Sequence, residues 1–174
     1  MEEKDINELL EKVFSNITSW LNFAETKNAA NIALVVACIA ALLSLDSMSQ
    51  LLYVIFILLV FSGICSMISF IPRLGGVTSK ISKLGKKTIK RKDEKDNLLF
   101  FEAIKNYSGQ EYVERVSDIY LQINKKDFNR YQLDLSNEIV YNSNIASYKY
   151  KFFKVAAYLD VTAFVLLAIS FIIA

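Results

Sequence analysis

Three long apolar stretches constrain the fold of this 174-residue chain more than any other feature. They cover Ala29–Leu45, Leu51–Ile71 and Val155–Ala174, and Asp160 is the only charged residue in them. About 20 apolar residues in a helix cross a bilayer core that is roughly 30 Å thick. The stretches therefore predict three transmembrane helices. Buried helices of a soluble protein are the alternative, but three of them are too many for the core of so short a chain.

The amino-acid composition further narrows the possible fold and function of the protein. The chain is 53% hydrophobic and has one Pro and five Gly, which favours helices over a many-stranded fold. It has no His, which excludes His-based zinc sites and Ser-His or Cys-His nucleophiles. Cys38 and Cys65 lie inside apolar stretches at different depths, so we interpret them as small apolar residues and not as a disulfide. We predict no enzyme activity, no catalytic residues, no metal site and no bound cofactor.

Basic residues predict the orientation in the membrane. The connection Asp46–Gln50 has no Lys or Arg, whereas Arg73–Lys92 has eight and no acid. Because positive charge stays on the cytoplasmic side, the N-terminus and the Arg73–Lys154 region are expected in the cytoplasm and Ala174 outside. A nucleic-acid patch is the competing interpretation of the basic run. Nothing in it resembles a sequence-reading module, so contact with anionic lipid is favoured and no nucleic acid is expected as a partner.

These features predict an all-α membrane protein in which a cytoplasmic helical region continues into the last transmembrane helix. No Pro or Gly occurs after Gly109, which allows one uninterrupted helix to reach Ala174. The predicted parts are an N-terminal amphipathic helix at 1–28, transmembrane helices at 29–45, 51–71 and 155–174, an external turn at 46–50, and a basic, helical cytoplasmic region at 72–154.

A capping-box pattern, Asp5-x-x-Glu8, predicts the start of the N-terminal helix. Apolar residues follow it at helical spacing, among them Ile6, Leu10, Val13, Ile17 and Trp20. The acids near its start argue against contact with anionic lipid. We therefore expect this helix to pack on protein.

The cytoplasmic region shows further helix signals. Asn97–Tyr107 is predicted to be a short helix, and Ser108-x-x-Glu111 is a second capping box that opens a helix to about Asn124. The residues expected on its apolar side are Tyr112, Val116, Ile119, Tyr120 and Ile123. Asp127 is predicted to cap the helix that continues into the last stretch.

Small and ionisable residues in the stretches are candidates for packing or assembly. Ala29, Ala33, Ala37 and Ala41 recur every four residues, and Gly63 lies in the second stretch. Small residues let helices approach closely in lipid, either within one hairpin or between subunits of a homo-oligomer. Asp160 is a candidate for assembly or gating because an acidic residue within a transmembrane helix usually has a function. The alternatives are that its side chain reaches the membrane interface or pairs with Lys27 or Lys154.

A polar and aromatic face precedes the last stretch. Asn137, Tyr141, Asn144 and Tyr148 follow one another at spacings of four, three and four residues. Tyrosine rings can stack on a base, and asparagine can bond a base edge. Lys149 could contact a phosphate. An ordinary solvated helix face is the alternative interpretation.

Several segments together resemble the Pycsar membrane effectors. The resemblance lies in FAETKNAANIALVVACIAALLSL, FIPRL, FFEAI and LSNEIVYNSNIASYKYKFFKVAAYL, which span most of residues 23–170. The family motif where the chain meets the membrane corresponds to Glu25, Thr26 and Lys27. The chain departs from the family pattern at Asn28, where alanine is commoner, and at Glu138, where an amide is expected.

The resemblance implies an antiviral role. Such effectors accompany a pyrimidine cyclase, sense cyclic CMP or cyclic UMP in the cytoplasm, and damage the bacterial inner membrane so that infection is abortive. Region 72–154 would then be the sensor, and the partners would be the lipid bilayer, the cyclic pyrimidine nucleotide from the cognate cyclase and further copies of the chain. Two other classes stay open: a two-span effector that answers a cyclic oligonucleotide, and a membrane scaffold without a ligand.

Overall fold

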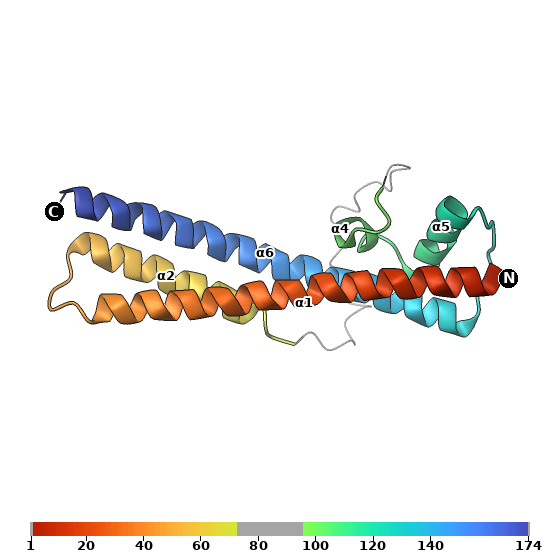
Figure 1. The fold of residues 1–174 in the computed structure, drawn as a ribbon, viewed down its shortest axis with the longest axis horizontal. Coiled ribbons are helices and arrows are strands. Elements are labelled where there is room, and N and C mark those ends of the chain that lie inside the picture. The colour runs from red at the N-terminus through yellow and green to blue at the C-terminus, as the bar shows by residue number, and fades with distance from the viewer. Residues whose placement is uncertain (1, 73–95, 174) are drawn as a thin grey trace. The chain divides into compact units, whose positions relative to one another are not determined.

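The computed structural model describes residues 2–72 and 96–173, and every regular element in these residues is an α-helix (Figure 1). This confirms the all-helical prediction. The basic run Arg73–Lys92 lies outside the described residues. The helices are α1 (Glu2–Leu43), α2 (Gln50–Ile68), α4 (Phe101–Ile104), α5 (Gly109–Leu121) and α6 (Arg130–Ile173).

Three of the helices, α1, α2 and α6, are long and apolar enough to cross a membrane. α1 is one helix of 42 residues, and no break separates its amphipathic beginning from its apolar end. The prediction that a capping box at Asp5 and Glu8 starts this helix is wrong. The helix begins at Glu2, and the acids of its first turn interact favourably with the helix dipole.

α6 is a single helix of 44 residues, which confirms that the last transmembrane helix continues into a helical region. The predicted cap Asp127 is wrong. Asn129 caps the helix instead, because its side-chain oxygen accepts from Gln132 N at 3.0 Å. The Gln132 side chain in turn accepts from Asn129 N at 3.3 Å, which completes a reciprocal cap.

The chain forms two compact units. The first contains Met1–Asn22 and Pro72–Ser147, and the second contains Phe23–Ile71 and Tyr148–Ala174. α1 and α6 therefore contribute residues to both units, whereas α4 and α5 belong to the first and α2 to the second.

In the first unit, the beginning of α1 packs on protein, as predicted. Its buried residues are Ile6, Leu10, Val13 and Ile17. Asn7 and Glu11 bond the beginning of α6: Gln132 donates to Asn7 at 2.9 Å, and the Tyr131 hydroxyl donates to Glu11 at 2.8 Å. Trp20 packs against the rings of Phe100 and Phe101 at centroid distances of 6.2 and 5.8 Å.

α5 begins with the predicted capping box, formed by Ser108 and Glu111. Its buried side faces the rest of the first unit through Tyr112, Val113 and Val116. Ile119 and Tyr120 were expected on that side but are exposed. The short helix predicted at 97–107 is limited to the four residues of α4, and the rest of that segment forms turns.

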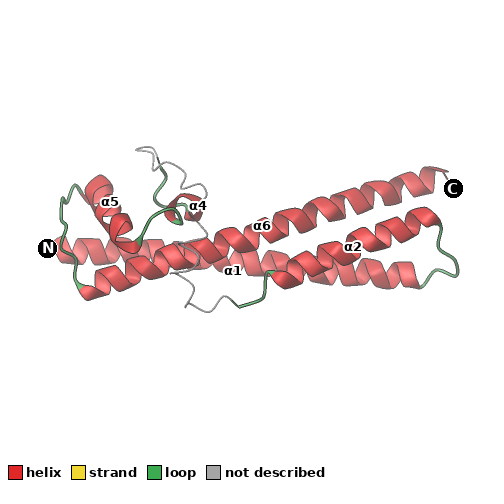
Figure 2. Ribbon diagram, turned by 180° about the vertical axis from the view of Figure 1, so that it is seen from behind, coloured by secondary structure: helices red, strands yellow, loops and turns green. Residues whose placement is uncertain are grey.

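In the second unit, the later parts of α1 and α6 lie alongside α2 (Figures 1 and 2). Toward the α1–α2 connection the three helices share an apolar cluster of Val35, Leu42, Ile55, Leu59 and Ala163. Gly63 allows α2 to approach α1 closely, since a Cβ atom there would lie 3.3 Å from Val35 Cγ1. Cys38 and Cys65 are free, as expected.

The alanines at positions 29, 33, 37 and 41 lie on the side of α1 that faces away from this contact, and all four are exposed. Gly63, but not the alanine row, therefore serves packing within the chain. The alanine row is available to lipid or to another subunit.

Candidate functional site

The first group of candidate residues lies in the second unit, where α1, α2 and α6 meet around Lys149. The side chain of Lys149 is only 7% exposed. Its ammonium lies 3.1 Å from a Glu25 carboxylate oxygen on α1 and donates to the carbonyl of Ser69, the C-cap of α2, at 3.0 Å. We call Glu25, Ser69 and Lys149 the clamp. It ties all three helices together with a charge-assisted contact in which the lysine side chain is buried and the Glu25 side chain is half-exposed.

Asn28 lies beside the clamp. Its side chain is fully buried and donates to the Ala24 carbonyl at 2.9 Å and to the Lys149 carbonyl at 3.4 Å. Asn28 therefore adds a polar contact between α1 and α6.

Lys27, the other charged residue of the family motif, is surrounded by aromatic rings. Its ammonium lies 4.5 Å from the ring centre of Phe23, 5.3 Å from Phe153 and 5.7 Å from Tyr150. Cation–π contacts of this kind hold a charge at the edge of an apolar region. Thr26 is exposed. The motif residues Glu25 and Lys27 thus both contact α6, and their role in this structure is to fasten α1 to it.

A second group of polar residues lies deeper along the same helices. Asn31 on α1 donates to the hydroxyls of Ser62 and Ser66 on α2, both at 3.0 Å, and Ser62 donates to the Ala156 carbonyl on α6 at 3.2 Å. Asp160 on α6 is 5% exposed, and Ser62 and Asn31 are the polar side chains beside its carboxylate. We call Asn31, Ser62, Ser66 and Asp160 the polar seam.

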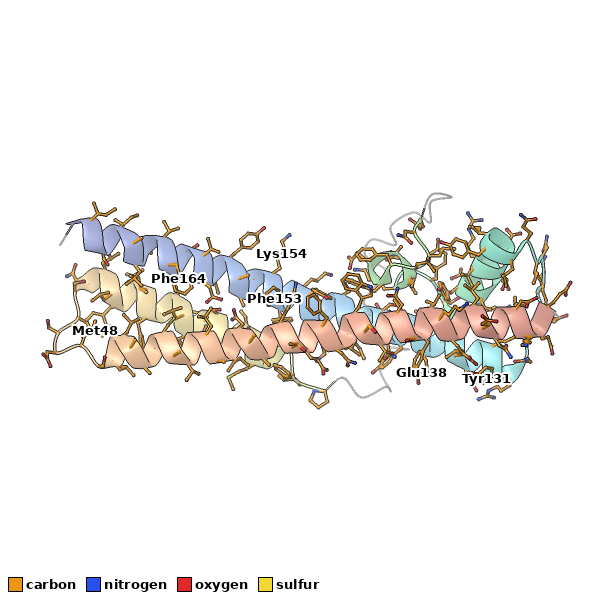
Figure 3. All side chains as sticks on the ribbon, in the orientation of Figure 1. Met48, Tyr131, Glu138, Phe153, Lys154 and Phe164 are labelled. Carbon is orange, nitrogen blue, oxygen red and sulfur yellow. The ribbon has the colours of Figure 1, made fainter. Side chains whose placement is uncertain are left out.

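The expected alternative of a pair between Asp160 and Lys27 or Lys154 is not formed. Lys27 is held by aromatic rings, and Lys154 is exposed and projects away from α1 and α2 (Figure 3). Within the described residues, neither carboxylate oxygen of Asp160 has a hydrogen-bond partner. An acid this deeply buried without a partner is unusual, because burial of an unpaired carboxylate is costly.

The predicted nucleotide-binding residues lie along α6 in different surroundings. Asn137 is exposed but packs against α5, because a Cβ atom at Gly109 would lie 2.2 Å from its side-chain oxygen. Asn144 is exposed and bonds back to the carbonyl of Val140 on its own helix at 2.9 Å. Tyr141 is half-buried.

The other two predicted ligand residues belong to the second unit. Tyr148 is half-buried and packs on Phe152 at a centroid distance of 4.6 Å. The Lys149 ammonium is already held by the clamp. A phosphate that contacts Lys149 would therefore have to compete with Glu25.

Sequence reasoning missed a partly buried polar cluster in the first unit. Ser147 on α6 is 3% exposed, donates to Glu102 at 2.7 Å and accepts from Lys105 at 2.8 Å, while Lys105 and Glu102 form an ion pair. Glu102 belongs to the family-like segment FFEAI, which was the available signal. In the same unit, burial raises the pKa of Tyr107 to about 12. The Asp96 carboxylate, which accepts a hydrogen bond from the Tyr107 hydroxyl, contributes to this rise.

In the part of the chain that the structure describes, no three His, Cys, Asp or Glu side chains gather as metal ligands would. The polar groups that do gather are the clamp, the polar seam and the Glu102–Lys105–Ser147 cluster.

The model of the Pycsar effector protein domain matches residues 9–174. No curated protein and no solved structure matches the chain. Since the family model covers nearly the whole sequence, the chain belongs to the Pycsar effector family and is an antiphage defence effector with transmembrane helices.

Proposed function

We propose that the protein senses cyclic CMP or cyclic UMP in the cytoplasm and then disrupts the integrity of the bacterial inner membrane, which causes abortive infection. The family match over residues 9–174 is the observation that carries this proposal. The helical architecture supports the proposal, since α6 is one continuous helix. It begins in the first unit, and a later part of it is apolar enough to cross a membrane. A cognate cyclase would supply the nucleotide, and no cofactor or metal is needed for such a response.

The orientation in this proposal follows from charge. Eight basic residues in Arg73–Lys92 support a location of the N-terminus and residues 72–154 in the cytoplasm, where the cyclase would make the messenger. The connection between α1 and α2 then faces outward.

The ligand site is proposed on the face of α6 that carries Tyr141, Asn144 and Tyr148, with Asn137 and Lys149 at its ends. Two half-buried rings and an exposed amide are groups that can hold a flat base. The ion pair between Lys149 and Glu25 suggests how binding could be transmitted: an anionic ligand that draws Lys149 away from Glu25 would release the clamp.

Binding is tested by calorimetric titration of the detergent-purified protein with cyclic CMP, cyclic UMP and cyclic AMP. Stacking contributes roughly 1–3 kcal/mol per base, so Tyr141→Ala and Tyr148→Ala should each weaken binding of a cyclic pyrimidine by about 5- to 150-fold. Tyr120→Ala removes an exposed ring from α5 and serves as the matched control. Unchanged affinity of both folded variants would place the site elsewhere.

The same titration, extended to a cyclic oligonucleotide, separates the alternatives. Binding of a cyclic oligonucleotide without any binding of cyclic pyrimidines would favour the two-span type of effector. No binding of any of these nucleotides, with a folded protein, would favour the ligand-free scaffold and contradict the proposed sensing.

Assembly through the alanine row is the second testable element. Ala33→Leu and Ala37→Leu enlarge exposed positions that face away from α2 and α6, so they should leave the fold intact. We expect them to lower the yield of cross-linked oligomer and the killing of infected cells, because bulky residues prevent close helix contact. Val36→Leu, at an exposed position beside the row, is the control. Wild-type cross-linking and killing in both variants would mean that the row only faces lipid.

A further inference from the structure

We propose that the polar seam becomes the wall of an aqueous path through the membrane when the effector is activated, and that Asp160 makes this path selective for small hydrated cations. The inference deepens the proposed function, on which it rests: it names the residues through which integrity is lost and the ions that pass.

The position of the seam is the first argument. Its residues come from three different helices and turn toward one another, while the outer faces of those helices expose large apolar residues such as Val36, Phe61 and Val165. Polar side chains within transmembrane helices are expensive and normally mark a pathway or a site. Thr162 shows the contrast, because its hydroxyl is exposed and only bonds the Tyr158 carbonyl of its own helix at 2.8 Å.

The hydrogen bonding of the seam is the second argument. If the seam served only to fasten helices, all of its members would be paired, as Asn31, Ser62 and Ser66 are. Asp160 departs from this rule, since among the described residues nothing donates to its buried carboxylate. A buried group without a partner calls for a function, and a carboxylate at the wall of a water-filled path would be solvated and attract cations.

The ends of the seam are the third argument. Along each helix the apolar cluster around Val35, Ile55 and Leu59 follows on the side of the α1–α2 connection. The clamp follows on the other side, with Glu25 before Asn31 on α1, Ser69 after Ser66 on α2, and Lys149 before Asp160 on α6. An apolar cluster on one side and the Glu25–Lys149 ion pair on the other close the seam in this structure. Their release would join it to water on both sides.

Proteoliposomes that contain the purified full-length chain provide the test. After addition of cyclic CMP or cyclic UMP, the potential across a KCl gradient reports whether potassium or chloride passes more easily. We expect the wild type to prefer potassium. Asp160→Asn, which keeps the shape but removes the charge, should lower the potassium-to-chloride preference several-fold, and Asp160→Glu should retain it.

Cysteine accessibility gives a second measurement that does not depend on charge selectivity. In protein without Cys38 and Cys65, Ser66→Cys should become sensitive to a charged, impermeant thiol reagent only after the nucleotide is added, and the reagent should reduce the ion flux. Thr162→Cys is the matched control at an exposed position of α6 and should leave the flux unchanged.

The outcomes are distinguishable. If the wild type conducts but Asp160→Asn keeps the same ion preference and Ser66→Cys stays insensitive, the seam only packs the helices, and this inference fails while the proposed function stands. If the wild type shows no flux with either nucleotide, the proposed function fails and takes the inference with it.

Discussion

Replacement of Lys149 by methionine should destabilise the second unit more than any other single change of a charged residue. Methionine preserves most of the volume but leaves the Glu25 carboxylate and the Ser69 carbonyl without the ammonium that they share. Removal of one partner from a buried ion pair costs about 3–5 kcal/mol, and the 46% exposure of the Glu25 side chain reduces the expected loss to about 2–3 kcal/mol. Denaturant unfolding of the detergent-purified protein, followed by circular dichroism, measures it.

Glu25→Gln is the control that separates the two roles assigned to Lys149. This variant weakens the clamp but leaves the lysine charge in place. If Lys149 contacts the nucleotide phosphate directly, Glu25→Gln should bind at least as tightly as the wild type, whereas Lys149→Met should bind more weakly. Equal losses of affinity in the two variants would contradict a direct contact and leave Lys149 with the clamp alone.

Gly109→Ala is expected to have the second large effect, in the first unit. An alanine Cβ would lie 2.2 Å from the side-chain oxygen of Asn137 and 2.9 Å from its backbone nitrogen, so α5 must move away from α6. Over-packing costs about 1–3 kcal/mol, and the contact with backbone, which cannot rotate away, favours the upper part of that range. The loss should appear although alanine is a better helix former than glycine by about 1 kcal/mol.

Gln110→Ala is the matched control because its side chain is exposed one position further along α5. It should unfold at the same denaturant concentration as the wild type. A second variant, Asn137→Gly combined with Gly109→Ala, removes the side-chain overlap but not the backbone contact, so only part of the stability should return. Wild-type stability of Gly109→Ala would show that α5 does not press on α6 in solution.

The sequence was most informative where one helix face decides the structure. The buried row of Ile6, Leu10, Val13 and Ile17 could be predicted because apolar residues at helical spacing must face a core. The start of α5 could be predicted because Ser108 and Glu111 satisfy each other locally. The transmembrane helices followed from the length and apolarity of the segments. Each of these features depends on neighbours in the chain.

Predictions were weaker where a residue's partner lies far away in the sequence. Lys149 looks like a free cation at the end of a polar face, but its partner Glu25 is on α1 and no local pattern joins the two. The same holds for Gly109, whose need for glycine arises from Asn137 on another helix. Helix starts were also missed where several capping residues compete: Asp127 and Asn129 are both good caps, and the reciprocal bond with Gln132 favours the second.

The clamp also bears on what happens in a cell that has not met a virus. A lethal protein has to stay silent in every one of its copies, and a two-state equilibrium shifts tenfold for each 1.4 kcal/mol or so. If the clamp belongs to the silent state, a loss of about 2–3 kcal/mol would raise the population of the harmful state roughly 30- to 150-fold without any messenger. Bacteria that carry such a variant would then grow poorly in the absence of infection. Toxicity in uninfected cells, and not the speed of the response to infection, would then limit which substitutions are tolerated at positions 25 and 149.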